Sequence, residues 1–179
     1  MSMWDTIKAD GRANGLTGPT STAMSLIGLA PFWLVASHRV AHCLSRRGVP
    51  VVPNLLRAIG TVVWGADIWP GASLGPGLRI THASGIVVGD AVVAGPDLTL
   101  FQGATLGGGS VLHPDWQSNQ PRLGRRVMVS SHAVVAGGIE IGDDVMIGAN
   151  AVVLADVAPR QIVRSPEPTV EPRRPRSSG

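Results

Sequence analysis

The chain has 179 residues, of which 44% are hydrophobic and only 4% aromatic, and its formal net charge is +3. This length suffices for one domain with a substantial hydrophobic core. Three arginines, Arg173, Arg174 and Arg176, lie near the end of the chain, and the charge pattern does not indicate a nucleic-acid-binding surface. The single cysteine, Cys43, excludes an intramolecular disulfide framework and is compatible with a reducing, cytoplasmic location.

No stretch of the sequence has the length and hydrophobicity of a membrane span. The longest uncharged run covers residues 13–37, and its strongly apolar part, 23–36, is interrupted by Gly28 and Pro31. It falls short of the roughly 20 residues that a span needs. The first residues also lack the apolar core of a secretory signal. We therefore predict no membrane association and interpret the run as a buried helical segment.

Residues 1–65 are expected to form a helical segment before the main domain. Residues 1–20 contain three glycines and a proline without sustained periodicity, so we expect them to be poorly ordered. One helix is predicted over 32–47 and a second over 53–63. His38 and His42 lie four residues apart on the first of these helices, where packing or hydrogen bonding is favoured over metal binding because no further ligand lies nearby in sequence.

From residue 66 onwards, small aliphatic residues recur at every sixth position. Neither the helical period of 3.6 nor the strand period of 2 gives this spacing, so we predict a repeating coil with three six-residue faces per turn. One unit cannot bury its apolar edge alone, whereas stacked units can. A sandwich of short strands is the alternative, but hairpin-linked strands do not keep a fixed six-residue register. The three series are Ile68, Leu74 and Ile80; Val88, Ala94, Leu100 and Leu106; and Val129, Val135, Ile141, Ile147 and Val153.

The repeat is interrupted over residues 107–126 and ends near residue 159. The interruption is polar and contains Gly and Pro, so we expect it to leave the coil as an extruded loop, and loops on rigid scaffolds commonly carry function. Residues 160–179 are rich in proline and charged residues, which predicts a disordered tail.

Three motifs in the coil resemble one enzyme family. They are D-I-x-P from residue 67, H-x-[ST]-G-x-V-[VI]-G from residue 82 and T-L-G-G from residue 105. Together with the hexad repeats, they are similar to the left-handed β-helix hexapeptide-repeat acyltransferases, and within them to the serine O-acetyltransferases. The resemblance covers residues 32–159. The resemblance implies a mainly β fold, a left-handed parallel β-helix over 66–159 with a short N-terminal helical segment. It also implies a homotrimer with active sites between subunits.

By this resemblance, His82 matches the catalytic histidine and Asp67 the aspartate that orients it. The chemistry agrees, because a neutral imidazole can accept the proton of a hydroxyl as it attacks a thioester carbonyl. A carboxylate on the other ring nitrogen fixes the tautomer and stabilises the imidazolium. The two residues are 15 positions apart (82 minus 67), so neighbouring layers of the coil are expected to bring them together. Two polar corner residues that face solvent are the alternative.

The resemblance further implies acetyl-CoA as the acyl donor, a small molecule as the acceptor and no metal ion. Glycines in the T-L-G-G run permit close approach of the donor to the backbone. The residues expected to contact the donor are Gly107, Gly108, Ser131 and Ala149. The residues expected to contact the acceptor are Thr81, His113, Gln120 and Arg122.

Two departures from the family pattern concern the acceptor. The family has Asp immediately before the catalytic His, where this chain has Thr81, and an Arg-His-Pro run where residues 119–121 read Asn-Gln-Pro. A second alignment places His113 at the family's histidine, but again without the arginine. We therefore expect a zwitterion such as L-serine to be a poor acceptor unless nearby arginines replace the missing charge. Those arginines are Arg122, Arg125 and Arg126.

Three other functions are compatible with the repeat. An acetyltransferase of the same fold can act on a sugar or an amine. A γ-type carbonic anhydrase needs three histidines around a metal, and no histidine pair within the coil has a ligand spacing. A non-catalytic assembly module is the third alternative.

Overall fold

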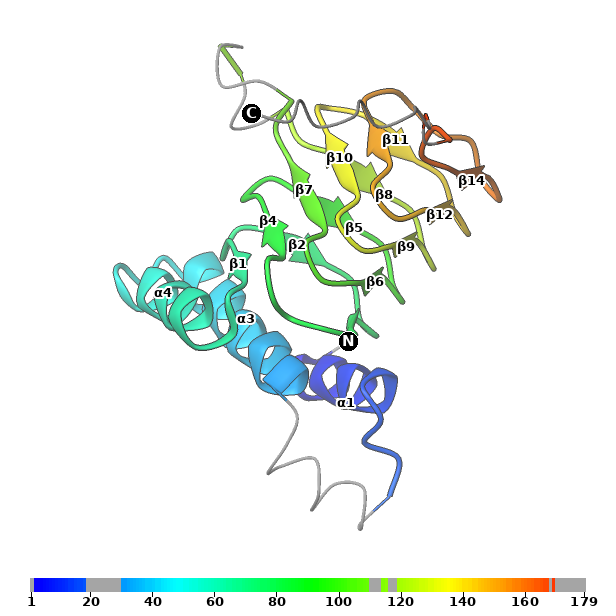
Figure 1. The fold of residues 1–179 in the computed structure, drawn as a ribbon. Helices are drawn as coiled ribbons and strands as arrows, with labels where there is room; N and C mark the ends of the chain where they lie inside the picture. The colour runs from blue at the N-terminus through cyan, green and yellow to red at the C-terminus, as the bar shows by residue number, and fades with distance from the viewer. Residues whose placement is uncertain (1, 19–29, 110–113, 116–118, 168, 170–179) are drawn as a thin grey trace, which may run out of the picture.

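The computed structural model describes residues 2–18, 30–109, 114–115, 119–167 and 169. Within them, three helices precede a stack of short parallel strands (Figure 1). The helices are α1 (Met3–Ala13), α3 (Ala30–Arg46) and α4 (Val52–Trp64). The strands are β1 (Asp67–Ile68), β2 (Ser73–Leu74), β3 (Arg79–Ile80), β4 (Val87–Val88), β5 (Val93–Ala94), β6 (Thr99–Leu100), β7 (Thr105–Gly107), β8 (Arg122–Leu123), β9 (Met128–Val129), β10 (Val134–Ala136), β11 (Glu140–Ile141), β12 (Met146–Ile147), β13 (Val152–Val153) and β14 (Ile162–Val163).

The strands form three parallel sheets, which are the three faces of one coil. Sheet A contains β1, β4, β7, β10 and β13; sheet B contains β2, β5, β8 and β11; sheet C contains β3, β6, β9, β12 and β14. Each strand pairs with a strand of the next coil, as Asp67 does with Val87 and Val87 with Thr105. The predicted coil with three faces per turn is therefore confirmed, and Figure 1 shows its layers stacked along one axis.

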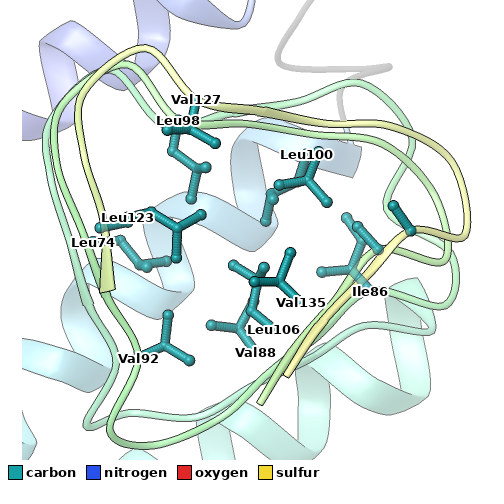
Figure 2. Packing of buried hydrophobic residues seen from close by; sticks show 14 of the residues in the cluster. Leu74, Ile86, Val88, Val92, Leu98, Leu100, Leu106, Leu123, Val127 and Val135 are labelled. Carbon is teal, nitrogen blue, oxygen red and sulfur yellow. The ribbon is translucent and has the colours of Figure 1, made fainter. Parts of the chain in front are cut away.

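Aliphatic side chains from all three faces fill the interior of the coil. In the two-residue strands before β14, the second side chain is buried, and every member of the three hexad series belongs to the resulting core. Figure 2 shows Val88, Leu106 and Val135, from three successive coils, pointing into this interior. Fully burying a side chain of this size contributes roughly 1.5–3 kcal/mol. The core therefore forms only when coils stack, because no single coil covers its own edge.

Glycines at the corner between sheets B and C allow the coils to stack there. A Cβ atom on Gly75 would lie 2.5 Å from the carbonyl carbon of Gly95, and one on Gly95 would lie 2.8 Å from that of Gly124. Because backbone of the next coil occupies the place of a side chain, only glycine fits at these positions.

Two predicted boundaries of the coil are wrong. The interruption is shorter than residues 107–126, because β8 already belongs to sheet B and Leu123 lies six residues before Val129. The coil also continues past residue 160, because β14 pairs with β12 in sheet C. Most of the predicted tail, residues 168 and 170–179, lies outside the described residues.

The helices predicted over 32–47 and 53–63 are present as α3 and α4, and their ends differ from the prediction by at most two residues. Gly65, with a φ of 67°, ends α4 in the left-handed conformation that favours glycine. Among the residues that the structure describes, no helix is long and apolar enough to cross a bilayer.

The expectation of poor order over residues 1–20 is wrong for α1. Ser2 begins this helix with a capping box, in which its hydroxyl accepts from the Asp5 backbone N–H at 3.2 Å and the Asp5 carboxylate accepts from the Ser2 N–H at 3.1 Å. Gly11 is buried inside the helix, where a Cβ atom would lie 3.1 Å from the Leu16 side chain. This glycine, which the sequence alone suggests is a breaker, instead allows close packing.

Side chains of α1 cover the open edge of the first coil on sheet C. The Asp10 carboxylate accepts from the backbone N–H of Leu78 at 2.9 Å. The Asn14 amide donates to the Leu78 carbonyl at 2.8 Å and accepts from the N–H of Ile80 at 3.1 Å. These side chains therefore satisfy the groups that a preceding strand would otherwise bind.

An ion pair holds α1 and α3 together at this edge. Arg39 Nε lies 2.8 Å from Asp10 Oδ2, and the two side chains are 7% and 1% exposed. The same guanidinium donates to the carbonyls of Leu74 and Gly75, the latter at 2.7 Å. Arg39 therefore joins two helices to the first coil.

Candidate active site

His82 lies at the corner between sheets C and A, in the first coil. The core positions Ile80 and Val88 are eight positions apart across this corner, whereas the other successive hexad positions from Ile68 to Leu106 are six apart. The extra length places His82 outward, where it is exposed. Gly85 turns the chain with a φ of 75°, and its N–H donates to the Gly65 carbonyl at 2.7 Å. The first two hexad series are therefore out of step by two residues, and these two extra residues form the protruding corner.

Asp67 begins sheet A beside this same corner. Its backbone N–H donates to the Ile86 carbonyl at 2.8 Å, which joins β1 to the segment that carries His82. The backbone of Asp67 thus pairs with the segment that follows His82 in sequence.

The predicted hydrogen bond between Asp67 and His82 is not formed in the structure of this chain. Both oxygens of the Asp67 carboxylate instead bind Arg57 of α4, at 2.5 Å to Nε and 2.7 Å to Nη2. The Arg57 guanidinium lies 3.5 Å from the centre of the Trp69 ring, and the hydrogen bonds that it donates to Asp67 raise the pKa of Arg57. No sequence motif marks Arg57, which lies ten positions before Asp67.

A pocket of about 430 Å³ opens beside His82. Thr81 and Arg79 of the first coil line it together with Arg12 and Asn14 from the end of α1. The Thr81 hydroxyl donates to the Leu100 carbonyl at 3.2 Å. Thr81 therefore lines the same pocket as His82, together with two arginines that the motifs do not reveal.

Gln120 does not line this pocket, contrary to the prediction. Its side chain is 7% exposed, and its Oε1 accepts from the backbone N–H of Ala91 at 3.1 Å. A Cβ atom on Gly89 would lie 2.2 Å from that oxygen. Gln120 therefore anchors the returning loop to the corner between sheets A and B, because its amide fills the space beside a glycine.

Arg122 also lies away from His82. It is on β8, in register with Val93 and Glu140, and it lines an open depression of about 670 Å³ on the outside of sheet B. Sheet B is the face opposite the corner between sheets C and A. Within the chain, Arg122 therefore lies on a different face from His82, and His113, the other predicted acceptor residue, lies outside the described residues.

Arg125 and Arg126 bind aspartates of the next coil. Arg125 Nε lies 2.9 Å from Asp143, and Arg126 Nε lies 2.6 Å from Asp144. Both pairs are at the corner between sheets B and C. These two arginines therefore do not supply the missing charge beside His82 in the same subunit.

The predicted donor residues divide between the two edges of sheet A. Ser131 and Ala149 follow β9 and β12 at the corner between sheets C and A, and the Ser131 carbonyl accepts from the Asn150 N–H at 3.0 Å. Successive strands lie roughly 4.8 Å apart, so Ala149, three coils above His82, lies about 14 Å from it along the corner.

Gly107 and Gly108 lie at the opposite edge of sheet A. Gly107 ends β7 where the loop leaves the coil, and a Cβ atom on it would meet no atom within 4 Å. The strand separates these two glycines from the corner with His82. The fold of the chain therefore does not bring all four predicted donor residues together.

His38 and His42 have different surroundings on α3. His38 is 4% exposed, and burial lowers its pKa to about 3. The His42 Nδ1 lies 2.8 Å from the Pro70 carbonyl oxygen. Across the described part of the chain, no group of three His, Cys, Asp or Glu side chains is arranged to hold a metal ion.

The sequence resembles those of known transferases. Residues 121–155 match the bacterial transferase hexapeptide (six repeats) family. The chain is 36% identical over 163 residues to a serine acetyltransferase of Mycobacterium tuberculosis, an alignment that covers 90% of this chain and 70% of the relative. It is 40% identical over 126 residues to a serine acetyltransferase of Synechococcus elongatus, which covers 70% of this chain and half of the relative.

A solved structure has the same fold. Serine acetyltransferase isoform 3 of Entamoeba histolytica, in complex with cysteine, superposes with a TM-score of 0.85 at 30% identity. The match covers 97% of this chain and 62% of that chain, so this chain spans only part of these relatives. The coil is therefore the left-handed parallel β-helix of the hexapeptide-repeat transferases, and the chain belongs to the serine acetyltransferase family.

Proposed function

We propose that the protein transfers the acetyl group of acetyl-CoA to a hydroxyl group of a small acceptor. The observation that carries this proposal is the position of His82. Its side chain is exposed, lines a pocket and lies on the one lengthened corner of the first two coils. The relatives of this chain are named serine acetyltransferases, which supports the reaction class. The carbonic anhydrase and assembly-module alternatives gain no support from these relatives.

In the proposed reaction, His82 acts as the general base. Its neutral imidazole accepts the proton of the acceptor hydroxyl while the oxygen attacks the thioester carbonyl. The tetrahedral intermediate then collapses, the carbon–sulfur bond breaks, and the departing sulfur receives the proton from the imidazolium. The products are an acetyl ester and CoA, so no further reactant is needed.

Asp67 is proposed to stabilise the imidazolium that forms at His82. Its backbone is joined to the corner that carries His82, and Arg57, packed on Trp69, fixes the carboxylate at that edge of sheet A. A fixed negative charge beside the corner favours the protonated ring in the transition state.

The division of the donor residues supports a homotrimer. Ser131 and Ala149 lie at one edge of sheet A, and Gly107 and Gly108 at the other. When two copies pack with opposite edges of sheet A in contact, Ser131 and Ala149 of one copy and Gly107 and Gly108 of the other line the same groove. Closed symmetry then repeats the groove at each interface of the assembly.

The function is tested with the full chain, acetyl-CoA and a panel of hydroxyl compounds. We expect release of CoA that depends on the acceptor, with an acetyl ester detected by mass spectrometry. A chelator is expected to leave the rate unchanged. Folded protein that acetylates no hydroxyl compound contradicts the proposal, and acetylation of amines alone replaces it with an N-acetyltransferase.

Asp67→Asn is expected to lower kcat by at least about tenfold, because the amide removes the charge that stabilises the imidazolium. KM for acetyl-CoA is expected to stay unchanged, since the proposed partner of Asp67 is His82 and not the donor. Asp143→Asn is the matched control, because Asp143 also binds an arginine but lies at another corner. A loss confined to KM for acetyl-CoA, or equal losses in both variants, contradicts this role.

A further inference from the structure

The pocket beside His82 contains two guanidinium groups. Arg79 projects from β3 and Arg12 from the last turn of α1, and both are exposed. Among the described residues, neither forms an ion pair. No carboxylate belongs to the described lining of this pocket. Two positive charges therefore face the open space next to the proposed base.

The other polar groups of the pocket are already engaged. The Asn14 amide binds the backbone of Leu78 and Ile80, and the Thr81 hydroxyl donates to Leu100. The nearest acidic side chain in sequence, Asp10, is buried against Arg39. An ammonium group in this space thus finds no carboxylate among the described residues, whereas an anion finds two cations.

We propose that this pocket selects an acceptor that carries anionic oxygens and no ammonium group, and that Arg79 and Arg12 determine this specificity. The shared chemistry is that of a small hydroxy acid or a phosphorylated alcohol. The inference rests on the proposed transfer of an acetyl group to a hydroxyl at His82. Guanidinium groups bind carboxylate and phosphate through paired hydrogen bonds, which are roughly twice as strong when charged as when neutral.

The strand geometry supports simultaneous contact with base and cation. Arg79 and Thr81 are two residues apart on β3 and its extension, so they project from the same face, about 6.6 Å apart along the chain. His82 follows at the corner. An acceptor of about three carbons can therefore place its hydroxyl at His82 while its anionic end reaches the long Arg79 side chain.

The test compares acceptors that differ in one charged group at a time. L-Serine carries both charges, 3-hydroxypropionate only the carboxylate, ethanolamine only the ammonium, and 1-propanol neither; 2-hydroxyethyl phosphate provides the phosphate arm. We expect kcat/KM for the better of the two anions to exceed that for ethanolamine at least tenfold and to exceed that for L-serine. The ratio between the two anions then identifies the anionic group.

Arginine variants connect this preference to the pocket. Arg79→Gln and Arg12→Gln are each expected to lower kcat/KM for the preferred anion at least tenfold, with the rate for 1-propanol and KM for acetyl-CoA unchanged. Arg126→Gln is the matched control, because Arg126 is an exposed arginine at another corner. A preference for L-serine or ethanolamine, or an anion preference that survives both pocket variants, overturns the inference.

Failure of the reaction itself is distinguishable from failure of this inference. If folded protein acetylates none of the five compounds, the proposed function fails, and calorimetric titration with 3-hydroxypropionate and with 2-hydroxyethyl phosphate decides the specificity. Binding of either anion that is lost in Arg79→Gln but kept in Arg126→Gln supports the anion site. Absence of binding by both anions overturns it.

Discussion

His82→Ala is expected to lower kcat by roughly 10²-fold or more, because a positioned general base contributes about 10²–10⁴ to the rate. The imidazole is exposed at a corner and forms no hydrogen bond with the described residues, so its removal is not expected to disturb the core. Turnover is measured as acceptor-dependent release of CoA at saturating acetyl-CoA.

Two further measurements make the result specific. His82→Gln keeps a polar side chain that cannot accept the proton, so the loss in kcat is expected to be as large as in His82→Ala. Thermal unfolding and the mass in solution are expected to match the wild type in both variants. Turnover near that of the wild type in a folded His82→Ala protein removes His82 from the role of base.

Arg39→Met is expected to destabilise the protein by about 3–5 kcal/mol, because it leaves the buried Asp10 carboxylate without its partner. Asp10 is fully buried and Arg39 is 7% exposed. Two carbonyls of the first coil, those of Leu74 and Gly75, lose their donor as well. The free energy of unfolding is measured by denaturant titration.

The charge and the hydrogen bonds contribute separately to this loss. Adding Asp10→Asn to Arg39→Met removes the unpaired charge and keeps an acceptor for the Leu78 N–H, so the double variant is expected to recover part of the loss. Arg126→Met breaks an exposed pair and is expected to have a much smaller effect. If Arg39→Met matches Arg126→Met, the buried pair does not stabilise the fold.

The hexad period predicted the coil because it is a local property of the sequence. Which side chain points inward depends only on its place within a face, so Val88, Leu106 and Val135 were placed in the core from their spacing alone. The lengthened corner at His82 was likewise visible, as a displacement of two residues between series. Leu123 and β14 are not recognisable in this way, because each belongs to a single short strand beside irregular chain and not to a run of hexads.

The residues that line the pocket cannot be identified from the hexad period, because tertiary contacts bring them together. Arg12, Arg57 and Asp10 reach the first coil only because the helices pack against it. Gln120 is expected to contact the acceptor because it aligns with the histidine of the family's Arg-His-Pro run, and an alignment does not distinguish an acceptor contact from a polar anchor. Only the packing against Gly89 distinguishes these two roles.

The hydrogen bonds from Asp10 and Asn14 to the backbone of β3 affect the order in which the chain is expected to fold. Strand pairs in the first coils join residues 18 or 20 positions apart, whereas the contacts of Asp10 and Asn14 with β3 join residues 64 to 68 positions apart. Closing a longer loop costs more entropy and slows folding. We therefore expect the coil to assemble before α1 docks, so that the edge at β3 is open to pairing with another chain in the interval. Because Arg12 belongs to α1, the pocket beside His82 is expected to be complete only after this helix has docked.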